Sequence, residues 1–173
     1  MKRHETLEVP TPVSPRLLRA TNEIQALYKS WDKGLSRIRV NAPIREEETS
    51  PTSRPRRRAL FFSCGVDSYY SLLKNVTNHP NDEETIKDLI FLRGFDIPFG
   101  GQDLAVFQTI LANARMLSRE LGRNLLPVAT NLRDFGSRFV RWDGLYHGSA
   151  LASVGLTLES ILEKIYIAAS FSH

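Results

Sequence analysis

A short run of small polar residues after an apolar stretch is the part of this chain that could do chemistry. The apolar residues 59–62 are followed by Ser63, Gly65 and Ser68, and a helical pattern begins at 69–73. N–H groups at the start of a helix have no partner within the helix, and the helix dipole makes that end electropositive. Two hydroxyls and an unhindered glycine at such a place favour an anion. We therefore predict a phosphate-binding loop between the apolar run and the helix.

The spacing within this loop excludes the common nucleotide motifs. A Walker loop needs a Gly-Lys-Ser/Thr ending and a dinucleotide fingerprint needs three spaced glycines, and the sequence has neither. A serine nucleophile elbow also fails, because no second glycine follows a serine at the required distance. Ser-Cys-Gly-Val-Asp-Ser instead resembles the PP-loop of the ATP pyrophosphatases, whose pattern is Ser-Gly-Gly-x-Asp-Ser at the end of the first strand. Cys64 stands where that family usually has its first glycine.

The resemblance implies a role for the residues of the loop. Ser63, Gly65 and Ser68 would hold the phosphate oxygens of ATP, and Asp67 would bind Mg²⁺ and act in catalysis. Magnesium suits this site because it binds through one or two carboxylates plus the phosphates of a substrate. The implied nucleotide-binding set is the whole loop: Ser63, Cys64, Gly65, Val66, Asp67 and Ser68. The alternative is that Asp67 and Ser68 merely cap a helix in an ordinary doubly wound domain.

Cys64 has two interpretations. A thiol at a helix N-terminus can have a lowered pKa and be reactive, as a persulfide or acyl carrier. We favour a tolerated replacement of glycine, because no histidine or second cysteine is placed by sequence to assist the thiol. If the backbone there needs a positive φ, cysteine is strained.

Polar residues also follow the second and third apolar runs, and in an open parallel sheet ligands bind beyond the carboxyl ends of the strands. Asp96 would accept a ribose hydroxyl or bind metal, and an exposed turn aspartate is the alternative. Asn131 and Arg133 are candidates to contact a phosphate or a second substrate. The alternative is that Asn131 caps a helix and Arg133 lies on the surface.

His147, Gly148 and Ser149 open a run of small and apolar residues after residues 142–146. A second helix N-terminus with small residues would make another anion site. His147 is the second candidate catalytic residue, with a structural histidine as the alternative. We expect all of these segments to converge on one crevice.

The elements that must position these residues alternate between strand and helix from residue 58 onward. Short apolar runs are typical of parallel strands buried on both faces, and they lie at 59–62, 89–92, 125–129 and 165–169. A helix is predicted from Asp103, an N-cap candidate, to the stop at Gly122. Its predicted core-facing stripe is Leu104, Phe107, Ile110, Leu111, Ala114, Leu117 and Leu121. We predict an α/β fold over 58–173, a three-layer, doubly wound parallel sheet that is HUP-like or Rossmann-like.

Residues 1–57 differ in composition and are predicted to form a partly irregular appendage. They hold six of the nine prolines, and 46–53 has no apolar residue and is expected to be a flexible linker. Apolar residues recur at helical spacing over 17–31, and an alternating pattern over 38–44 predicts a short strand. We expect this helix and strand to dock on the edge of the main domain.

Composition limits the partners. The net charge is +4, and without Arg54, Arg56, Arg57 and Arg58 the remaining 19 basic and 19 acidic residues balance. RNA docking through this basic segment is an alternative to a solvated linker. One cysteine and four scattered histidines offer neither a disulfide nor zinc-ligand spacing. No apolar run is long enough to cross a bilayer, so we expect a soluble, cytoplasmic protein with no membrane partner, and a homodimer is an option.

The loop, the Phe-Asp-Ile-Pro exit of the second strand, Asn-Leu-Arg and His-Gly-x-x-Leu-Ala together resemble uncharacterised bacterial PP-loop proteins near 7-cyano-7-deazaguanine synthase. This resemblance covers residues 58–170. It implies cleavage of ATP between the α and β phosphates and adenylation of an unknown small-molecule or RNA substrate. Such proteins continue further, so we expect a fragment or a shortened member. The alternatives are a nucleotide-binding module without catalysis and an RNA-modification protein.

Overall fold

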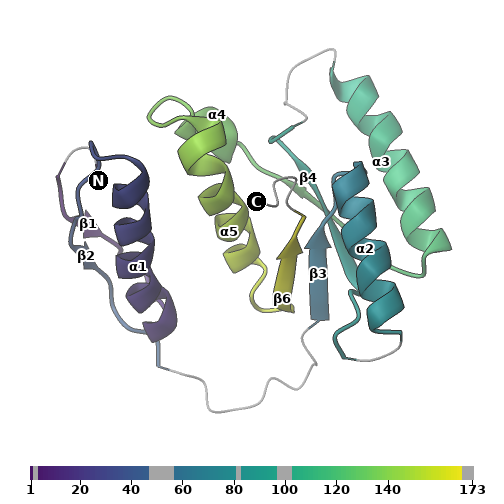
Figure 1. Cartoon of the computed structure of the whole chain (residues 1–173), viewed down its shortest axis with the longest axis horizontal. Coiled ribbons are helices and arrows are strands. Elements are labelled where there is room, and N and C mark those ends of the chain that lie inside the picture. Colours follow the sequence, from purple (N-terminus) through teal and green to yellow (C-terminus); the bar gives the residue numbers. More distant parts are fainter. Residues whose placement is uncertain (2–3, 47–56, 81–82, 97–102, 169–173) are drawn as a thin grey trace. The chain divides into compact units, whose positions relative to one another are not determined.

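Two units make up the chain, Met1–Ser53 and Arg54–His173. The computed structural model, drawn in Figure 1, describes residues 1, 4–46, 57–80, 83–96 and 103–168. The predicted boundary at 57/58 lies near this division, and the first strand of the second unit begins at Arg57. No helix in the described part of the chain is both long enough and apolar enough to cross a lipid bilayer.

The first unit contains a helix and two short strands: β1 (Leu7–Glu8), α1 (Pro15–Trp31) and β2 (Val40–Asn41). The predicted helix is confirmed, and the Ser14 hydroxyl caps it by accepting the N–H of Leu17 at 3.1 Å. Inside the unit, the buried Gln25 side chain accepts the Ile38 N–H at 2.7 Å. The predicted strand is found as β2, which pairs with β1 in a parallel sheet within this unit. The sequence prediction missed β1, because two residues are too short for a periodic signal.

The second unit alternates strands and helices along the chain: β3 (Arg57–Phe61), α2 (Val66–Asn78), β4 (Asp88–Arg93), α3 (Asp103–Glu120), β5 (Asn124–Ala129), α4 (Leu132–Gly136), the π-helical turn η1 (Trp142–Tyr146), α5 (His147–Thr157) and β6 (Leu162–Ile167). Its described strands pair in parallel in the order β5-β4-β3-β6. An α/β fold with a parallel sheet is therefore confirmed, and it is compatible with a Rossmann-like fold.

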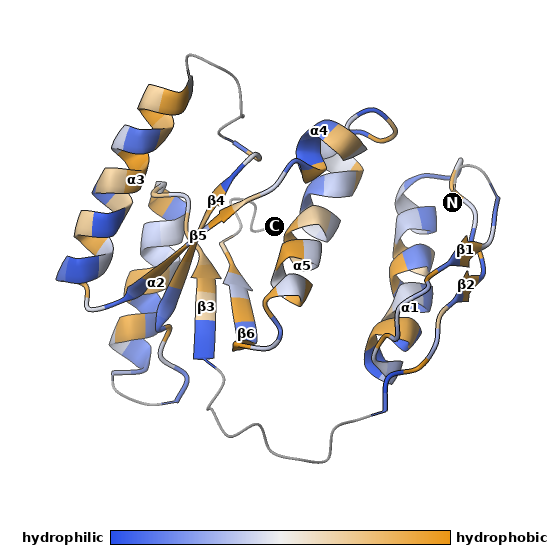
Figure 2. Ribbon diagram, turned by 180° about the vertical axis from the view of Figure 1, so that it is seen from behind, coloured by the Kyte–Doolittle hydropathy of each residue, from blue (hydrophilic) through white to orange (hydrophobic). Residues whose placement is uncertain are grey.

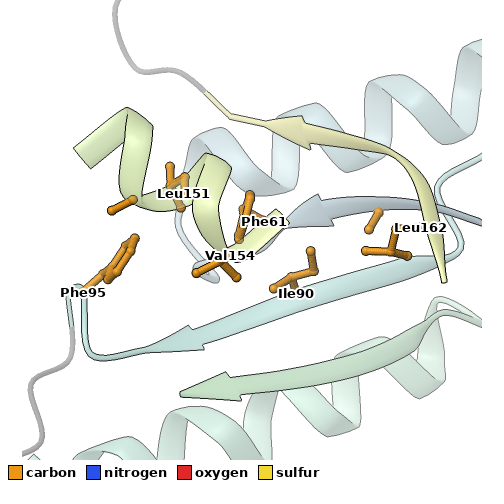
Figure 3. Packing of buried hydrophobic residues seen from close by; sticks show 8 residues of the cluster. Phe61, Ile90, Phe95, Leu151, Val154 and Leu162 are labelled. Carbon is orange, nitrogen blue, oxygen red and sulfur yellow. The ribbon is translucent and has the colours of Figure 1, made fainter. Parts of the chain in front are cut away.

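Side chains of β3 alternate between two hydrophobic clusters, because successive residues of a strand point to opposite faces of a sheet. Phe61 packs with Ile90 of β4 and with Leu151 and Val154 of α5 (Figure 3). Leu60 belongs to the other cluster, which includes residues of α2 and α3. Figures 1 and 2 accordingly show α5 on one side of the sheet and α2 and α3 on the other. Strands covered in this way need apolar residues on both faces, which explains the continuous apolar runs in the sequence.

The predicted long helix is confirmed as α3, with one change to its core face. Gly122 has a φ of +62° just beyond the helix, the left-handed conformation that commonly ends helices. Ala114 is fully buried, as the stripe predicts, but Leu104 is 44% exposed. Leu104 lies in the first turn of α3, where the predicted core-facing stripe extends too far. Periodicity gives the direction in which a side chain points, but it does not show where the sheet beneath the helix ends.

Ion pairs hold the amino ends of the strands, opposite the edge that the loop 63–68 occupies. Arg57 Nε lies 2.8 Å from Oδ2 of the fully buried Asp88, without the alignment of a hydrogen bond. Arg58 Nη2 donates to Glu84 Oε1 at 2.7 Å, and Lys164 Nζ donates to Glu84 Oε2 at 3.1 Å. The hydrogen bond from Lys164 holds the pKa of the Glu84 carboxyl below its ordinary value. In Figure 2 the charged start of β3 is the hydrophilic end of an otherwise apolar strand.

Candidate functional site

A cavity of about 210 Å³ lies at the carboxyl ends of β3 and β4 and beside the start of α5. Strands β3, β4 and β5 follow one another toward one edge of the sheet, whereas β6 lies on the other side of β3. Ligands bind at such a reversal of strand order, because the connections leave neighbouring strands in opposite directions. The cavity is lined by Phe61, Phe62, Ser63, Gly65, Asp67, Ser68, Ile90, Leu92, Phe95, Asp96, His147, Leu151, Ile167 and Ala168.

Six of the predicted site residues are among these lining residues: Ser63, Gly65, Asp67, Ser68, Asp96 and His147. They come from three segments, namely the loop after β3, the exit of β4 and the start of α5. The expected convergence on one crevice is therefore found for these three segments. The segment after β5 does not contribute to the lining.

Hydrogen bonds within the loop 63–68 fold it back on itself. Ser68 is 2% exposed and donates its hydroxyl to the Gly65 carbonyl at 2.8 Å. The Ser63 Oγ accepts the Gly65 N–H at 3.3 Å and donates to the Ser68 Oγ at 3.4 Å. The bond from Ser68 is strong, whereas the two bonds of Ser63 are long and weak. Ser68 therefore shapes the loop, and Ser63 is the hydroxyl that a ligand can recruit most easily.

The start of α2 opens directly from this loop. Gly65 is its N-cap residue, and glycine has no side chain to accept the N–H groups of the first turn. A Cβ at Gly65 would lie 3.2 Å from the Ser63 Oγ, so glycine also permits the close approach of the two residues. Asp67 lies in the first turn, where a carboxylate interacts favourably with the helix dipole. This arrangement leaves the backbone N–H groups as the electropositive feature of the loop.

Cys64 has a φ of +64°, in the left-handed region that favours glycine. The half-buried thiol packs with Tyr69 against the hydrophobic cluster of α2 and α3, and it does not line the cavity. Burial raises the pKa of the Cys64 thiol above its ordinary value of 9.0. A protonated thiol is a poor nucleophile, so these observations favour a tolerated replacement of glycine over a reactive cysteine.

The exit of β4 brings Asp96 to the cavity through a sharp turn. Gly94 has a φ of +101°, which a residue with a side chain rarely adopts. After this turn Phe95 is buried, at 3% exposure, while the next residue, Asp96, is exposed at the cavity. The buried phenyl ring therefore anchors the segment that presents the carboxylate.

His147 reaches the cavity from a helix that continues an earlier turn. Its N–H donates to the Trp142 carbonyl, so α5 follows η1 without a free N-terminus at this point. The His147 N–H is therefore not available to an anion, unlike the free N–H that the sequence predicts at a helix start. Gly148 does not line the cavity, and the Ser149 hydroxyl donates to the Tyr146 carbonyl at 3.0 Å. The sequence did not indicate that residues 142–146 are already helical, because a π-helical turn has no simple apolar period.

Asn131 and Arg133 are placed away from the cavity lining. Asn131 is exposed and precedes α4, without a capping hydrogen bond from its side chain. Arg133 donates to the Phe95 carbonyl and makes a cation–π contact with the Trp142 ring, with 5.1 Å between Cζ and the ring centroid. This arginine is half-buried and does not line the cavity. Val66, also among the predicted residues, is 84% exposed and lies outside the lining.

The apolar part of the lining was not predicted as part of a site. It consists of Phe61, Phe62, Ile90, Leu92, Phe95, Leu151, Ile167 and Ala168. Six of these residues lie within the predicted strands 59–62, 89–92 and 165–169, which is a signal that the sequence carries. Which of them face the cavity depends on strand register and on the helix opposite, and these are tertiary features.

The charge of the cavity restricts how an anion can bind. Asp67 and Asp96 line it, and no lysine or arginine is among the described lining residues. No group of three or more His, Cys, Asp or Glu side chains is suited to hold a metal ion anywhere in the described part of the chain. An anionic ligand must therefore be neutralised by backbone N–H groups and by a cation that it brings with it.

Comparisons with protein-family models, with curated proteins and with solved structures found no match to this chain. The functional assignment consequently depends on the geometry of the cavity and of the loop 63–68.

Proposed function

We propose that the second unit binds Mg²⁺–ATP in this cavity and cleaves it between the α and β phosphates, adenylating a second substrate. The observation that carries the proposal is the loop 63–68, which leaves β3, begins α2 at Gly65 and presents Ser63 to the cavity. The PP-loop that the sequence resembles has the same place after the first strand. We also propose that the fold is a three-layer, doubly wound sheet, because in such a sheet the ligand binds where the strand order reverses.

Phosphate binding would exchange weak hydrogen bonds within the loop for stronger ones. The Gly65 N–H donates to the Ser63 Oγ at 3.3 Å, and a phosphate oxygen would take this donor and the next N–H groups of α2. The displaced Ser63 hydroxyl is then able to donate to the same phosphate. Hydrogen bonds to a charged acceptor are about twice as strong as neutral ones, so the exchange favours the bound state. Ser68 keeps the loop in shape through its bond to the Gly65 carbonyl.

The two carboxylates fit a magnesium ion that arrives with the nucleotide. Asp67 and Asp96 are oxygen ligands that line one cavity, and Mg²⁺ usually takes one or two carboxylates together with substrate phosphates. When bound, the ion would neutralise charge on the pyrophosphate as it leaves. Without it, two carboxylates would face the nucleotide with no cationic side chain in the described lining to balance them.

His147 is the residue best placed to exchange a proton with the second substrate. It lines the cavity from α5, whereas the loop 63–68 lines it from α2, so a bound ligand would lie between the two. An imidazole can serve as a general base or as a general acid. The cavity is smaller than the roughly 300 Å³ of typical ligand pockets, so it would hold only part of the nucleotide.

A nucleotide-binding module without catalysis is the second candidate. The left-handed backbone of Cys64 favours it, because a strained residue beside the phosphate loop would weaken the positioning of the nucleotide. RNA docking through residues 54–58 has less support. Arg57 and Arg58 are paired with Asp88 and Glu84 at the opposite edge of the sheet, and Arg54 and Arg56 lie outside the described residues.

Thermal unfolding with ATP tests the binding, and pyrophosphate release tests the reaction. At 100 times its Kd, ATP should stabilise the wild-type protein by about 2.7 kcal/mol, a rise of about 5 to 10 °C in Tm. The rise should shrink in EDTA because the carboxylates then oppose the nucleotide. D67N should lose the rise, whereas D134N, at an exposed acid in α4 outside the cavity lining, should keep it.

The possible results separate the candidate functions. No rise in Tm with Mg²⁺–ATP in the wild-type protein would refute nucleotide binding in this cavity. A rise without pyrophosphate release across carboxylate, amide and RNA substrates would support the binding module over the enzyme. Equal rises in wild type and D67N would remove Asp67 from the site.

A further inference from the structure

The guanidinium of Arg133 joins two segments that are far apart in the sequence. Its Nη1 donates a hydrogen bond to the carbonyl oxygen of Phe95, at the exit of β4. Its Cζ lies 5.1 Å from the centroid of the Trp142 ring in η1, which is a cation–π contact. Arg133 is not among the residues that line the cavity, so any effect on the cavity passes through these contacts.

Each of the two segments carries a residue of the cavity. Asp96 follows Phe95 directly, so the hydrogen-bonded carbonyl fixes the peptide that leads into Asp96. In the other segment, the ring centroids of Trp142 and His147 are 5.1 Å apart. The Phe95 ring lies 4.7 Å from Trp142 and 6.0 Å from His147. These three side chains, which we call the ring cluster, therefore pack together, and Arg133 holds two of the three residues.

The π-helical turn η1, which precedes His147, makes the contact between Arg133 and Trp142 important for the position of the imidazole. A single π-helical turn is a rare conformation that occurs frequently at functional sites. In η1 it is Trp142, the first residue, that contacts both Arg133 and Phe95, and His147 follows the last residue. The position of the imidazole thus depends on how firmly the start of the turn is held.

We propose that Arg133 is a positioning residue that fixes the ring cluster and so holds His147 and Asp96 at the cavity. This inference rests on the proposed function, in which both residues serve the bound nucleotide. Arginine suits the role because a planar guanidinium donates hydrogen bonds in its plane while its face stacks on an indole ring. Lysine can supply the charge and a donor but has no planar face.

Nuclear magnetic resonance of the His147 ring tests the positioning without any ligand. The ring protons of His147, assigned from the signals lost in H147N, should carry a ring-current shift from Trp142. R133A should remove most of this shift and R133K part of it. The control R138A removes the same charge from an exposed arginine on the same segment and should leave the shift unchanged.

An unchanged His147 shift in folded R133A would overturn the proposal. If R133A does not fold, R133K decides by the same criterion, because it keeps the positive charge near the Phe95 carbonyl. An equal change in R138A would also overturn it, since the effect would then be one of overall charge. Loss of the shift in R133A but not in R138A supports the positioning role.

A double-mutant cycle on ATP affinity tests whether Arg133 acts through His147. R133A should weaken ATP binding about tenfold in the wild-type background and less than about twofold in H147N, because coupled residues are not additive. Equal losses in both backgrounds would overturn the route through His147. A wild-type protein with the ring-current shift but without ATP binding would count against the proposed function alone, whereas an unchanged shift in R133A counts against Arg133.

Discussion

Substitution of Cys64 by glycine tests whether the loop 63–68 is strained. Cys64 has a φ of +64°, and this left-handed conformation costs a residue with a Cβ about 1 to 2 kcal/mol. Glycine avoids that cost, but compared with alanine it lowers the free energy of unfolding by about 0.5 to 1 kcal/mol, because a glycine has more conformational entropy in the unfolded chain. Glycine should therefore be more stabilising than alanine at this position by about 0.5 to 1 kcal/mol.

Alanine is the matched comparison because both substitutions remove the thiol. A buried group of methylene size contributes about 0.8 kcal/mol, and about half of that applies to the half-buried thiol of Cys64. C64A should therefore lower the free energy of unfolding by about 0.4 kcal/mol. C64G should equal the wild-type protein or exceed it slightly, because the relief of strain offsets the lost packing.

Urea unfolding followed by tryptophan fluorescence measures this difference. The chain has two tryptophans, so a Trp31→Phe background leaves Trp142 as the only reporter, within the second unit. The slope of unfolding free energy against urea should be the same in C64A and C64G, since neither changes the surface exposed on unfolding. A C64A protein as stable as C64G, with equal slopes, would refute the assignment of strain to this backbone position.

The thiol of Cys64 gives an independent check of the same local structure, because it is the only cysteine in the chain. Burial raises its pKa, so the rate of alkylation by iodoacetamide should reach half its maximum above pH 9.0. In strong urea the midpoint should return to the value of a free cysteine. A midpoint well below 9.0 in the folded protein would instead support a reactive thiolate.

Packing and charge elsewhere in the second unit lead to further expected outcomes. A Cβ at Gly136 would lie 1.8 Å from Cε1 of Tyr146, so G136A should lower the free energy of unfolding by about 1 to 3 kcal/mol. At Gly148 nothing lies within 4 Å of such a Cβ, so G148A in α5 should raise the free energy of unfolding by about 0.5 to 1 kcal/mol. Equal free energies of unfolding for G136A and G148A, measured in urea, would contradict this packing. The hydrogen bond from Lys164 lowers the pKa of the Glu84 carboxyl in the folded protein. The ionised carboxyl therefore stabilises the fold above its unfolded-state pKa near 4.5, and this stabilisation is lost as pH falls through the lower folded-state pKa. Thermal unfolding should therefore show E84Q less stable than wild type at neutral pH and equally stable in strong acid, and a difference that persists in acid would contradict it.

Local features of the sequence predicted the four strands of the second unit and the helices α2 and α3 correctly. The apolar runs predicted the four parallel strands. Burial on both faces explains the runs of β3 and β4, most of whose residues are buried, whereas β5 and β6 end the strand order and have few buried residues. The glycine at 122 predicted the end of α3, since a left-handed residue ends a helix through its own backbone. The position of Ser63 and Ser68 between a strand and a helix predicted a turn at the edge of the sheet. Each of these inferences depends only on residues adjacent in the chain.

Other features required the packed molecule, because they depend on residues distant in sequence. The sequence offered phosphate binding or surface exposure for Arg133, whereas its side chain joins the exit of β4 to η1. His147 was expected to begin a helix, but a π-helical turn runs into it and its N–H donates to the Trp142 carbonyl. The strand pattern at 38–44 predicted β2, but only the fold shows that its partner is β1, 33 residues earlier in the chain.

What the sequence determined by itself is therefore the order of the main strands and long helices and the position of a candidate phosphate loop, since periodicity and turn chemistry act over a few residues. The tertiary structure decided which candidates share a cavity: Asp67, Asp96 and His147 do, and Asn131 and Arg133 do not. The physical reason is that strand order and register place the ends of distant strands side by side, and no local pattern encodes that placement. The same tertiary structure also showed that Cys64 occupies a backbone conformation suited to glycine, which the motif suggested but only the φ angle reveals.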